Sequence, residues 1–192
     1  AASSTVTVAA NRGLYVGTIR TTGSAGTTTW EVGGNAVNGD PGVFYVWNCY
    51  NRVLHQALVS DNTNSWVYNT ASFRSKNAST TNRVTLVRGL NEDVVIAGVA
   101  AKSTHTVANE SMTIGVGLDS TTALSIPGHG ANTNGPAADR YAFLSLMVAM
   151  YPGLGLHFLQ ALEYGSGAAT HTWIGDDLGG AVAFPLTVCA LM

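Results

Sequence analysis

The sequence predicts an all-β fold, an antiparallel β-sandwich of jelly-roll type with long loops rich in Gly, Asn and Thr. Three observations predict it. Short runs alternate between polar and apolar residues, as residues 4–9 do, which is the period of a half-buried strand. Clusters of Gly, Pro, Asn and Asp separate these runs at the spacing expected of a sandwich. Finally, the chain contains 22 threonines, which favour extended backbone.

The first half of the chain predicts strands at residues 4–9 and 14–21, followed by a long loop over 22–42 with a short strand at 28–32. Residues 43–50 are dense in aromatic and β-branched residues and predict a strand, with 52–59 as its hairpin partner. Further strands are predicted at the following segments: 65–68, 83–88, 93–99 and 112–118.

The second half begins with a predicted Gly-, Pro- and Asn-rich loop over residues 125–139. Residues 142–150 then fit either a helix by propensity or a buried strand by their surroundings. Segments 156–164, 171–174 and 180–184 read as strands, and Pro185 restricts the last of them to an edge or a bulge. The total is about ten to twelve strands, in the range of a sandwich.

The length of 192 residues suits one domain, and no change in composition divides it, so residues 1–192 are predicted to form a single β-sandwich. The first residues lack an initiator Met and also lack the basic start and apolar core of a signal peptide. We therefore expect a processed product or the C-terminal part of a longer chain.

Charge is scarce, because charged residues make up 10% of the chain against roughly 25% in a typical soluble domain. Lys76 and Lys102 are the only lysines, and lysine is depleted from protein–protein interfaces. The exterior is therefore predicted to be either a neutral polar coat or a surface covered by other subunits. Scattered arginines and a net charge of −2 argue against nucleic acid, and no apolar run is long enough for a membrane helix.

Cys49 and Cys189 are too few for a disulfide scaffold, and each lies in an apolar run. Free buried thiols and a single bridge are both compatible with the sequence.

Metal and cofactor motifs are weak. His157, His171, Glu163 and the Asp176–Asp177 pair supply ligand types, but His157 and Glu163 are about 20 Å apart along one strand and cannot bind one ion. The Asp pair lacks the spacing of a calcium loop, and the G-x-G at 115–117 lacks the third glycine of a dinucleotide motif. We therefore predict no metal and no cofactor.

Four side chains are candidates for contact with a glycan or a partner protein. Trp30, Trp66 and Trp173 lie beside predicted loops, where exposed rings could stack on sugars, and His129 lies in a glycine-flanked loop. Trp47, in the middle of a predicted strand, is interpreted as a core residue. No nucleophile elbow appears, and a glycosidase would have only four glutamates to draw on, so no catalytic residue is assigned.

Three segments resemble a module of structural proteins of tailed bacteriophages. They are GTIRTTG at 17–23, VWNCYNR at 46–52 and GLDSTTA at 117–123. The order of the three segments matches the module across roughly residues 14–123, and the C-terminal third matches less clearly.

The resemblance implies a non-enzymatic virion component, such as a capsid decoration protein, a head fibre or a tail fibre or spike. Proteins of this kind are commonly β-rich trimers on the particle surface, and some bind host glycans. From the residues themselves, Asn48 and Asn51 suit a turn at a strand end, and Arg20 and Arg52 could pair with Glu31 or Asp40 or reach a subunit interface. A carbohydrate- or receptor-binding domain and a polysaccharide hydrolase remain the alternatives.

Overall fold

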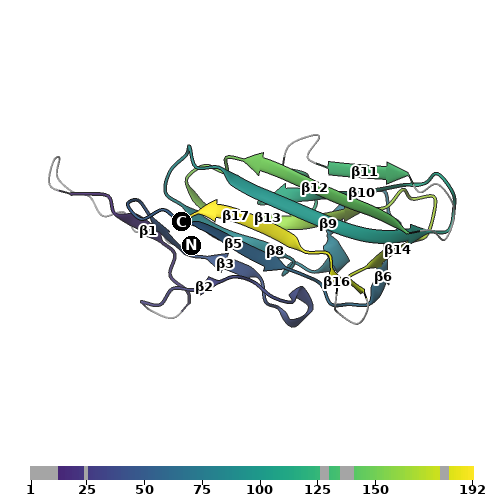
Figure 1. Ribbon diagram of the computed structural model, residues 1–192, viewed down its shortest axis with the longest axis horizontal. Helices are drawn as coiled ribbons and strands as arrows, with labels where there is room; N and C mark the ends of the chain where they lie inside the picture. Colours follow the sequence, from purple (N-terminus) through teal and green to yellow (C-terminus); the bar gives the residue numbers. More distant parts are fainter. Residues whose placement is uncertain (1–12, 24–25, 126–129, 135–140, 178–181) are drawn as a thin grey trace.

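The computed structural model describes residues 13–23, 26–125, 130–134, 141–177 and 182–192, and it confirms the all-β prediction (Figure 1). The described residues form seventeen strands and two single 3₁₀ turns, Ala36–Asn38 and Lys76–Ala78. This exceeds the ten to twelve strands predicted, because the structure adds strands of two or three residues such as β7 and β15. The main strands form two sheets that pack as a sandwich around one core.

The first sheet has the order β11-β10-β13-β8-β3-β2, and β7 extends it beside β13. Its pairs are antiparallel except for β3 and β8, which are parallel. The bounds are β2 Trp30–Glu31, β3 Gly42–Phe44, β7 Phe73–Ser75, β8 Arg83–Arg88, β10 Ser111–Leu118, β11 Gly130–Asn134 and β13 Gly155–Tyr164.

The second sheet has the order β5-β17-β9-β14-β6, with β12 along the other side of β9. β9 is its centre, because β12 follows it over nine residues on one side and β17 and β14 share the other side. The bounds are β5 Leu54–Val59, β6 Ser65–Val67, β9 Val95–His105, β12 Ala142–Met150, β14 His171–Ile174 and β17 Leu186–Leu191. β15 (Asp176–Asp177) and β16 (Val182–Ala183) form a separate small ribbon.

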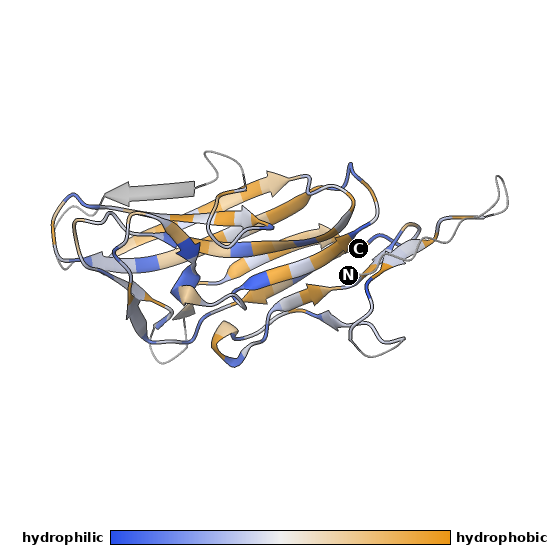
Figure 2. Ribbon diagram, turned by 180° about the vertical axis from the view of Figure 1, so that it is seen from behind, coloured by the Kyte–Doolittle hydropathy of each residue, from blue (hydrophilic) through white to orange (hydrophobic). Residues whose placement is uncertain are grey.

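The core follows from the two-residue period of the strands. Along β9, alternate residues from Val95 to Ala101 are buried, and along β13 the run from Leu159 to Leu162 is buried. Trp47 is buried to 1% exposure, which confirms its interpretation as a core residue. Orange stretches along the strands in Figure 2 show how much of both sheets is apolar.

Two ambiguous segments are resolved by strand pairing. Residues 142–150 form strand β12 and not a helix, because their backbone pairs with β9 along its whole length. The predicted loop over 125–139 contains β11, whose backbone pairs with β10 at the edge of the first sheet although Gly and Asn are poor strand formers. Cys49 and Cys189 are both free. None of the described residues forms a helix of the length and apolarity that a membrane crossing requires.

The first two segments of the phage-like module lie side by side as strands β1 (Gly17–Ile19) and β4 (Val46–Asn48). A Cβ at Gly17 would lie 2.3 Å from the carbonyl oxygen of Trp47, so this pairing requires glycine there. Asn48 accepts hydrogen bonds from the backbone N–H groups of Tyr50 and Asn51, as expected of an amide that holds a turn. In the third segment, Ser120 accepts from the N–H groups of Thr122 and Ala123 and closes the turn after β10. The module therefore consists of structural residues.

Candidate assembly surface

The outer side of the second sheet is apolar where the alternation of its strands would ordinarily place polar residues. Strands β12, β9 and β17 run across the front of Figure 1, and β5 lies beside β17. We call a set of twelve outward residues of these four strands the apolar face. They are Leu54, Gln56, Leu58, Ile96, Gly98, Ala100, Phe143, Ser145, Met147, Ala149, Thr187 and Cys189.

The largest side chains of the apolar face are well exposed. Met147 is 77% exposed and Phe143 65%, and both project from β12. Leu54 and Leu58 on β5, at 62% and 45%, and Ile96 on β9 extend the same surface across the sheet. Exposed apolar patches of this kind mark interaction sites in soluble proteins.

Strand register brings residues of the apolar face into rows across the sheet. Met147 is paired with Gly98, Gly98 with Thr187, and Thr187 with Leu58. The neighbouring row runs from Ala149 through Ile96 to Cys189. Because these rows cross four strands, the apolar residues form one continuous surface.

The residues of the apolar face carry no charge themselves, but Lys102 lies on the same side of β9 and is paired in register with Phe143. The Lys102 side chain is 7% exposed, and its ammonium lies 3.9 Å from the centre of the Tyr141 ring and 5.6 Å from that of Phe143. These cation–π contacts hold the charge against two aromatic rings, one of which belongs to the face. A partner that covers the face would therefore meet no carboxylate, and it would meet one ammonium that aromatic rings already contact.

The size of the apolar face approaches that of a protein interface. The nine-residue ladder between β12 and β9 is about 30 Å long at about 3.3 Å per residue. Four strands about 4.8 Å apart, with their side chains, span about 20 Å. The resulting outline of about 600 Å² compares with roughly 800 Å² per partner in a standard interface.

A groove of about 260 Å³ lies within the apolar face. Its lining includes Ile96, Gly98, Met147, Pro185, Thr187 and Cys189. Gly98 lies at the centre of this set, between Met147 of β12 and Thr187 of β17. We call this hollow the Gly98 groove.

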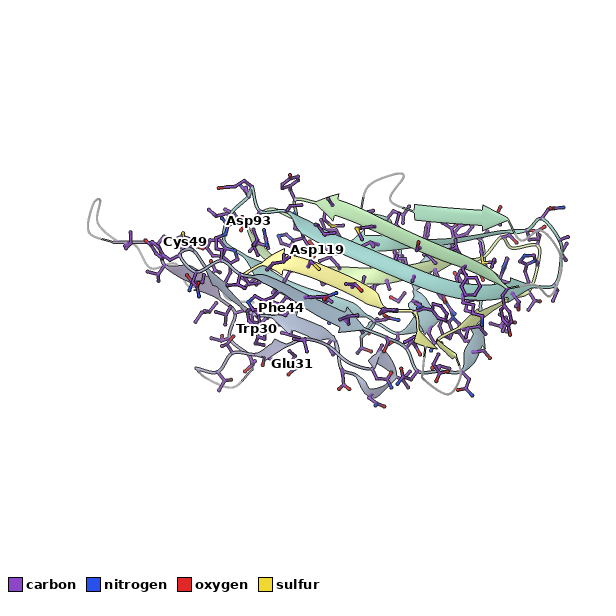
Figure 3. The ribbon with its side chains drawn as sticks, in the orientation of Figure 1. Trp30, Glu31, Phe44, Cys49, Asp93 and Asp119 are labelled. Carbon is purple, nitrogen blue, oxygen red and sulfur yellow. The ribbon has the colours of Figure 1, made fainter. Side chains whose placement is uncertain are left out.

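The predicted glycan contacts do not come together at one site. Trp173 is fully buried, and its indole N–H donates to the carbonyl oxygen of Tyr68, so its ring cannot meet a ligand at the surface. Trp66 is half-buried and faces inward to Glu163. Trp30 is 38% exposed and packs on Phe44, beside which it lies in Figure 3. His129 lies outside the described residues.

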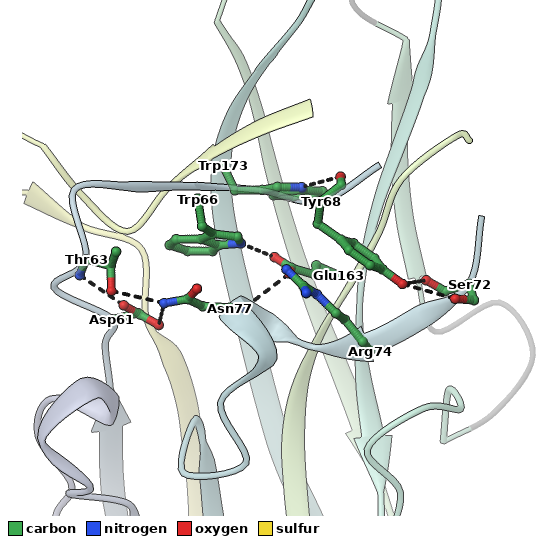
Figure 4. Close-up of polar contacts among 9 residues, drawn as sticks. All are labelled: Asp61, Thr63, Trp66, Tyr68, Ser72, Arg74, Asn77, Glu163 and Trp173. Carbon is green, nitrogen blue, oxygen red and sulfur yellow. Dashed lines mark hydrogen bonds and ion pairs between the residues drawn. The ribbon is translucent and has the colours of Figure 1, made fainter. Parts of the chain in front are cut away.

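A buried polar network binds the two sheets together at one end of the sandwich (Figure 4). Glu163 on β13 accepts from Arg74 Nε at 2.7 Å, from Trp66 Nε1 at 2.8 Å and from the backbone N–H of Asn77 at 3.2 Å. Trp66 belongs to the second sheet, so its bond to Glu163 crosses the core. Burial raises the pKa of Glu163, and the nearby charge of Arg74 opposes this shift.

Lys76 lies next to this network and is fully buried, and its ammonium donates to the carbonyl oxygens of Ala100 and Phe184. Burial lowers the pKa of Lys76 to about 8, against the opposing charges of Glu163 and Asp61. At neutral pH the ammonium is therefore still mostly protonated, and it acts as a clamp from the 3₁₀ turn after β7 to β9.

The His157 and Arg52 ion pairs each join two side chains and do not form part of a metal-ligand cluster. His157 pairs with Asp119 at 2.7 Å, and Arg52 pairs with Asp93, not with Glu31 or Asp40 as suggested from sequence. Across the described ranges, no three His, Cys, Asp or Glu side chains come together as a metal site would require.

Two histidines face each other inside the sandwich. His105 of β9 and His171 of β14 are paired in register, both are buried, and their ring centres lie 6.0 Å apart. His171 Nε2 accepts from the backbone N–H of Ser166. Burial lowers the pKa of His171, the neighbouring His105 lowers it further, and Glu110 opposes both.

This pair predicts a loss of stability in acid. Because the pKa of His171 is lower in the folded chain, the unfolded chain binds more protons as the pH falls below about 6.5. Stability from this group is complete above that pH and is lost as the pH falls through the folded value. Urea unfolding measured between pH 7.5 and 5 gives the free energy of unfolding as a function of pH. This free energy should fall less steeply with falling pH in His171→Gln than in the unaltered protein, because the glutamine amide can still accept from Ser166 but does not titrate. Equal slopes for the two proteins would contradict the prediction.

Comparisons with known proteins were made for the whole chain. No family model and no curated protein matches it. Among solved structures, a chain in "Structure of infectious bursal disease virus Gx strain" is 13% identical, with a TM-score of 0.32. The match covers 76% of this chain and 38% of that one. With this TM-score the likeness contributes no argument about function, which has to rest on the described residues.

Sequence reasoning predicted a covered surface but not its location. The signal was present in residues 142–150, where every residue but Ser145 is apolar and neither side of the strand carries a charge. Read as a strand, this pattern places Phe143, Ser145 and Met147 outside. As long as a helix was also possible, the sequence could not place these three residues on one side, because a helix would have distributed them around its axis.

Proposed function

We propose that this chain is a structural protein of a bacteriophage particle, which works by assembling with copies of itself and with neighbouring virion proteins. The role requires no catalytic residue, cofactor or metal. Capsid decoration, a head fibre and a tail fibre or spike are all compatible with it, and a trimer is the assembly that we favour.

The observation that supports the proposal most is the apolar face of the second sheet, on whose side of the four strands no carboxylate lies. Leaving Met147, Phe143 and Leu54 in water costs about 25 cal/mol for each Å² of apolar surface that a partner would cover. Few charges elsewhere on the chain are consistent with a protein made for permanent contacts. The virion setting is supported by the resemblance of the β1 and β4 segments to the phage module.

Assembly is tested by the mass of the protein in solution. Multi-angle light scattering should give a multiple of 19.9 kDa that holds on dilution to low micromolar concentration. Met147→Glu should weaken assembly by about 100-fold or more, because each interface would then bury an unpaired carboxylate. The matched control is Thr85→Glu, which places the same charge on β8 in the other sheet.

Two results would contradict the proposal. A monomer of the unaltered protein at all concentrations would remove its basis, and so would an oligomer that tolerates Met147→Glu as well as Thr85→Glu. Mass spectrometry of purified particles from the host that carries this sequence tests the virion setting separately.

Binding of a host glycan is a second candidate, and Trp30 is the observation that favours it. Of the three predicted contact rings, this one is exposed, and His55 supports it edge-on with ring centres 4.7 Å apart. A glycan array with the unaltered protein and with Trp30→Ala decides the matter: binding that the variant loses supports it, and no binding excludes it.

A further inference from the structure

Gly98 is a glycine that the fold itself does not require. A Cβ at this position would meet the Leu146 carbonyl oxygen at 3.7 Å and Thr187 Cβ at 4.0 Å, which are ordinary van der Waals contacts. Its backbone is regular strand, and the positive backbone angles of several other glycines do not occur here. A glycine inside a strand lowers stability, so its presence at 98 calls for another reason.

Two other strand glycines of this chain are explained by close contacts within the chain. A Cβ at Gly42 would lie 2.9 Å from both Ala57 Cβ and Val84 Cγ2, and one at Gly117 would lie 2.3 Å from the Ser120 carbonyl oxygen. Gly98 differs from both because the space above it is open and forms the Gly98 groove. When no close contact within the chain requires a strand glycine, the glycine often marks a place where another backbone or a ligand approaches the strand closely.

We infer that the Gly98 groove receives an apolar side chain from a second copy of this chain, and that Gly98 is the residue that keeps the groove open. The inference rests on the proposed function and names the contact by which the copies recognise each other. Met147 and Phe143 are the most exposed apolar side chains of the face, and they are the candidates for the inserted side chain.

Size and charge both favour a second copy as the occupant. A phenyl-sized group fits a cavity of about 150 Å³, so a groove of 260 Å³ has room for one apolar side chain and its backbone. Small-molecule sites are larger, at roughly 300–1,000 Å³, and contain placed polar groups. Each copy has a net charge of −2, and because no Asp or Glu lies on this side of the four strands, two like-charged copies meet here without bringing carboxylates together.

Gly98→Val is the variant that tests the inference. Valine suits a strand and meets ordinary contacts within the chain, so the fold should persist while the groove is filled. We expect light scattering to show at least a tenfold rise in the concentration needed for assembly, with Gly98→Ala in between. Thr85→Val, on β8 of the other sheet, is the matched control and should assemble as the unaltered chain does.

The outcomes separate this inference from the proposed function. An oligomer that Gly98→Val leaves intact would overturn the groove contact and still allow assembly by another route, such as pairing along the edge of β12. A monomeric unaltered protein would overturn both. Loss of assembly by Gly98→Val with an unchanged circular dichroism spectrum and an intact Thr85→Val oligomer would support both.

Cys189 provides a readout that does not depend on any variant. It lines the groove, while Cys49, the other free thiol, follows β4 outside the apolar face. A neutral maleimide should label Cys189 at least tenfold more slowly in the assembled protein than after dilution below the concentration at which light scattering shows the oligomer dissociating, relative to Cys49. A ratio that stays the same across that dissociation would overturn the inference, even if Gly98→Val failed to fold.

Discussion

Replacing Glu163 by alanine is expected to lower the free energy of unfolding by about 3–5 kcal/mol, the range for breaking a buried ion pair from one side. The carboxylate accepts from Arg74, Trp66 and Asn77, and it faces the buried ammonium of Lys76. Its removal leaves the Trp66 and Asn77 donors without this acceptor and the buried ammonium of Lys76 without the charge of Glu163. Arg74, whose side chain is 28% exposed, keeps contact with water.

Urea unfolding at pH 7, followed by circular dichroism, measures this effect, and the melting temperature should fall by about 10 °C or more. Glu31→Ala removes a carboxylate from the exposed strand β2 and should change the free energy by less than about 0.5 kcal/mol. Glu163→Gln keeps the shape and one acceptor oxygen, so its loss should be intermediate. Equal stabilities for Glu163→Ala and Glu31→Ala would contradict the role assigned to the network.

Replacing Asp93 by alanine is expected to have an effect at least as large. Asp93 is 3% exposed and lies near Cys49 at the end of the sandwich from which the β1–β4 pair extends (Figure 3). It accepts from Trp47 Nε1 at 3.1 Å and pairs with Arg52 and, at 3.4 Å, with Arg88. The Arg88 side chain is fully buried, and a guanidinium cannot release its proton to escape the cost.

The free energy of unfolding of Asp93→Ala should therefore be at least about 3–5 kcal/mol lower than that of the unaltered chain. Glu92→Ala, which removes the neighbouring exposed carboxylate, is the control and should leave stability nearly unchanged. Adding Arg88→Met to Asp93→Ala removes the stranded charge and should recover more than half of the loss. No recovery in the double variant would show that Arg88 is not the reason.

How far sequence predicts this fold depends on whether the determining contacts are local. The alternation of polar and apolar residues placed most strands of 43–59, 83–118 and 156–174 close to their observed positions, because the two-residue period is visible within a few residues. It could not choose between helix and strand for 142–150, where every residue but Ser145 is apolar. Pairing with β9 made that choice, since backbone groups at the edge of a sheet need partners.

The candidate site was predictable only in kind. Scarce charge indicated a surface covered by partners, but its location requires knowing that β12, β9, β17 and β5 are neighbours, and β5 and β12 are separated by more than eighty residues of chain. The bond between Trp66 and Glu163 spans 97 residues and left no mark on the spacing of either. Trp173 looked accessible beside a loop, yet tertiary packing buries it.

By itself, then, the sequence determined the class of fold, the low charge and the presence of an apolar segment at 142–150, because these follow from composition and from contacts within a few residues. The tertiary structure alone decided that this segment is a strand, which strands join into the apolar face, where Gly98 opens its groove, and which acids neutralise the half-buried Arg74 and the buried Lys76 and Arg88. The physical reason is that side chains are buried and paired by neighbours in space, and most of those neighbours are distant along the chain.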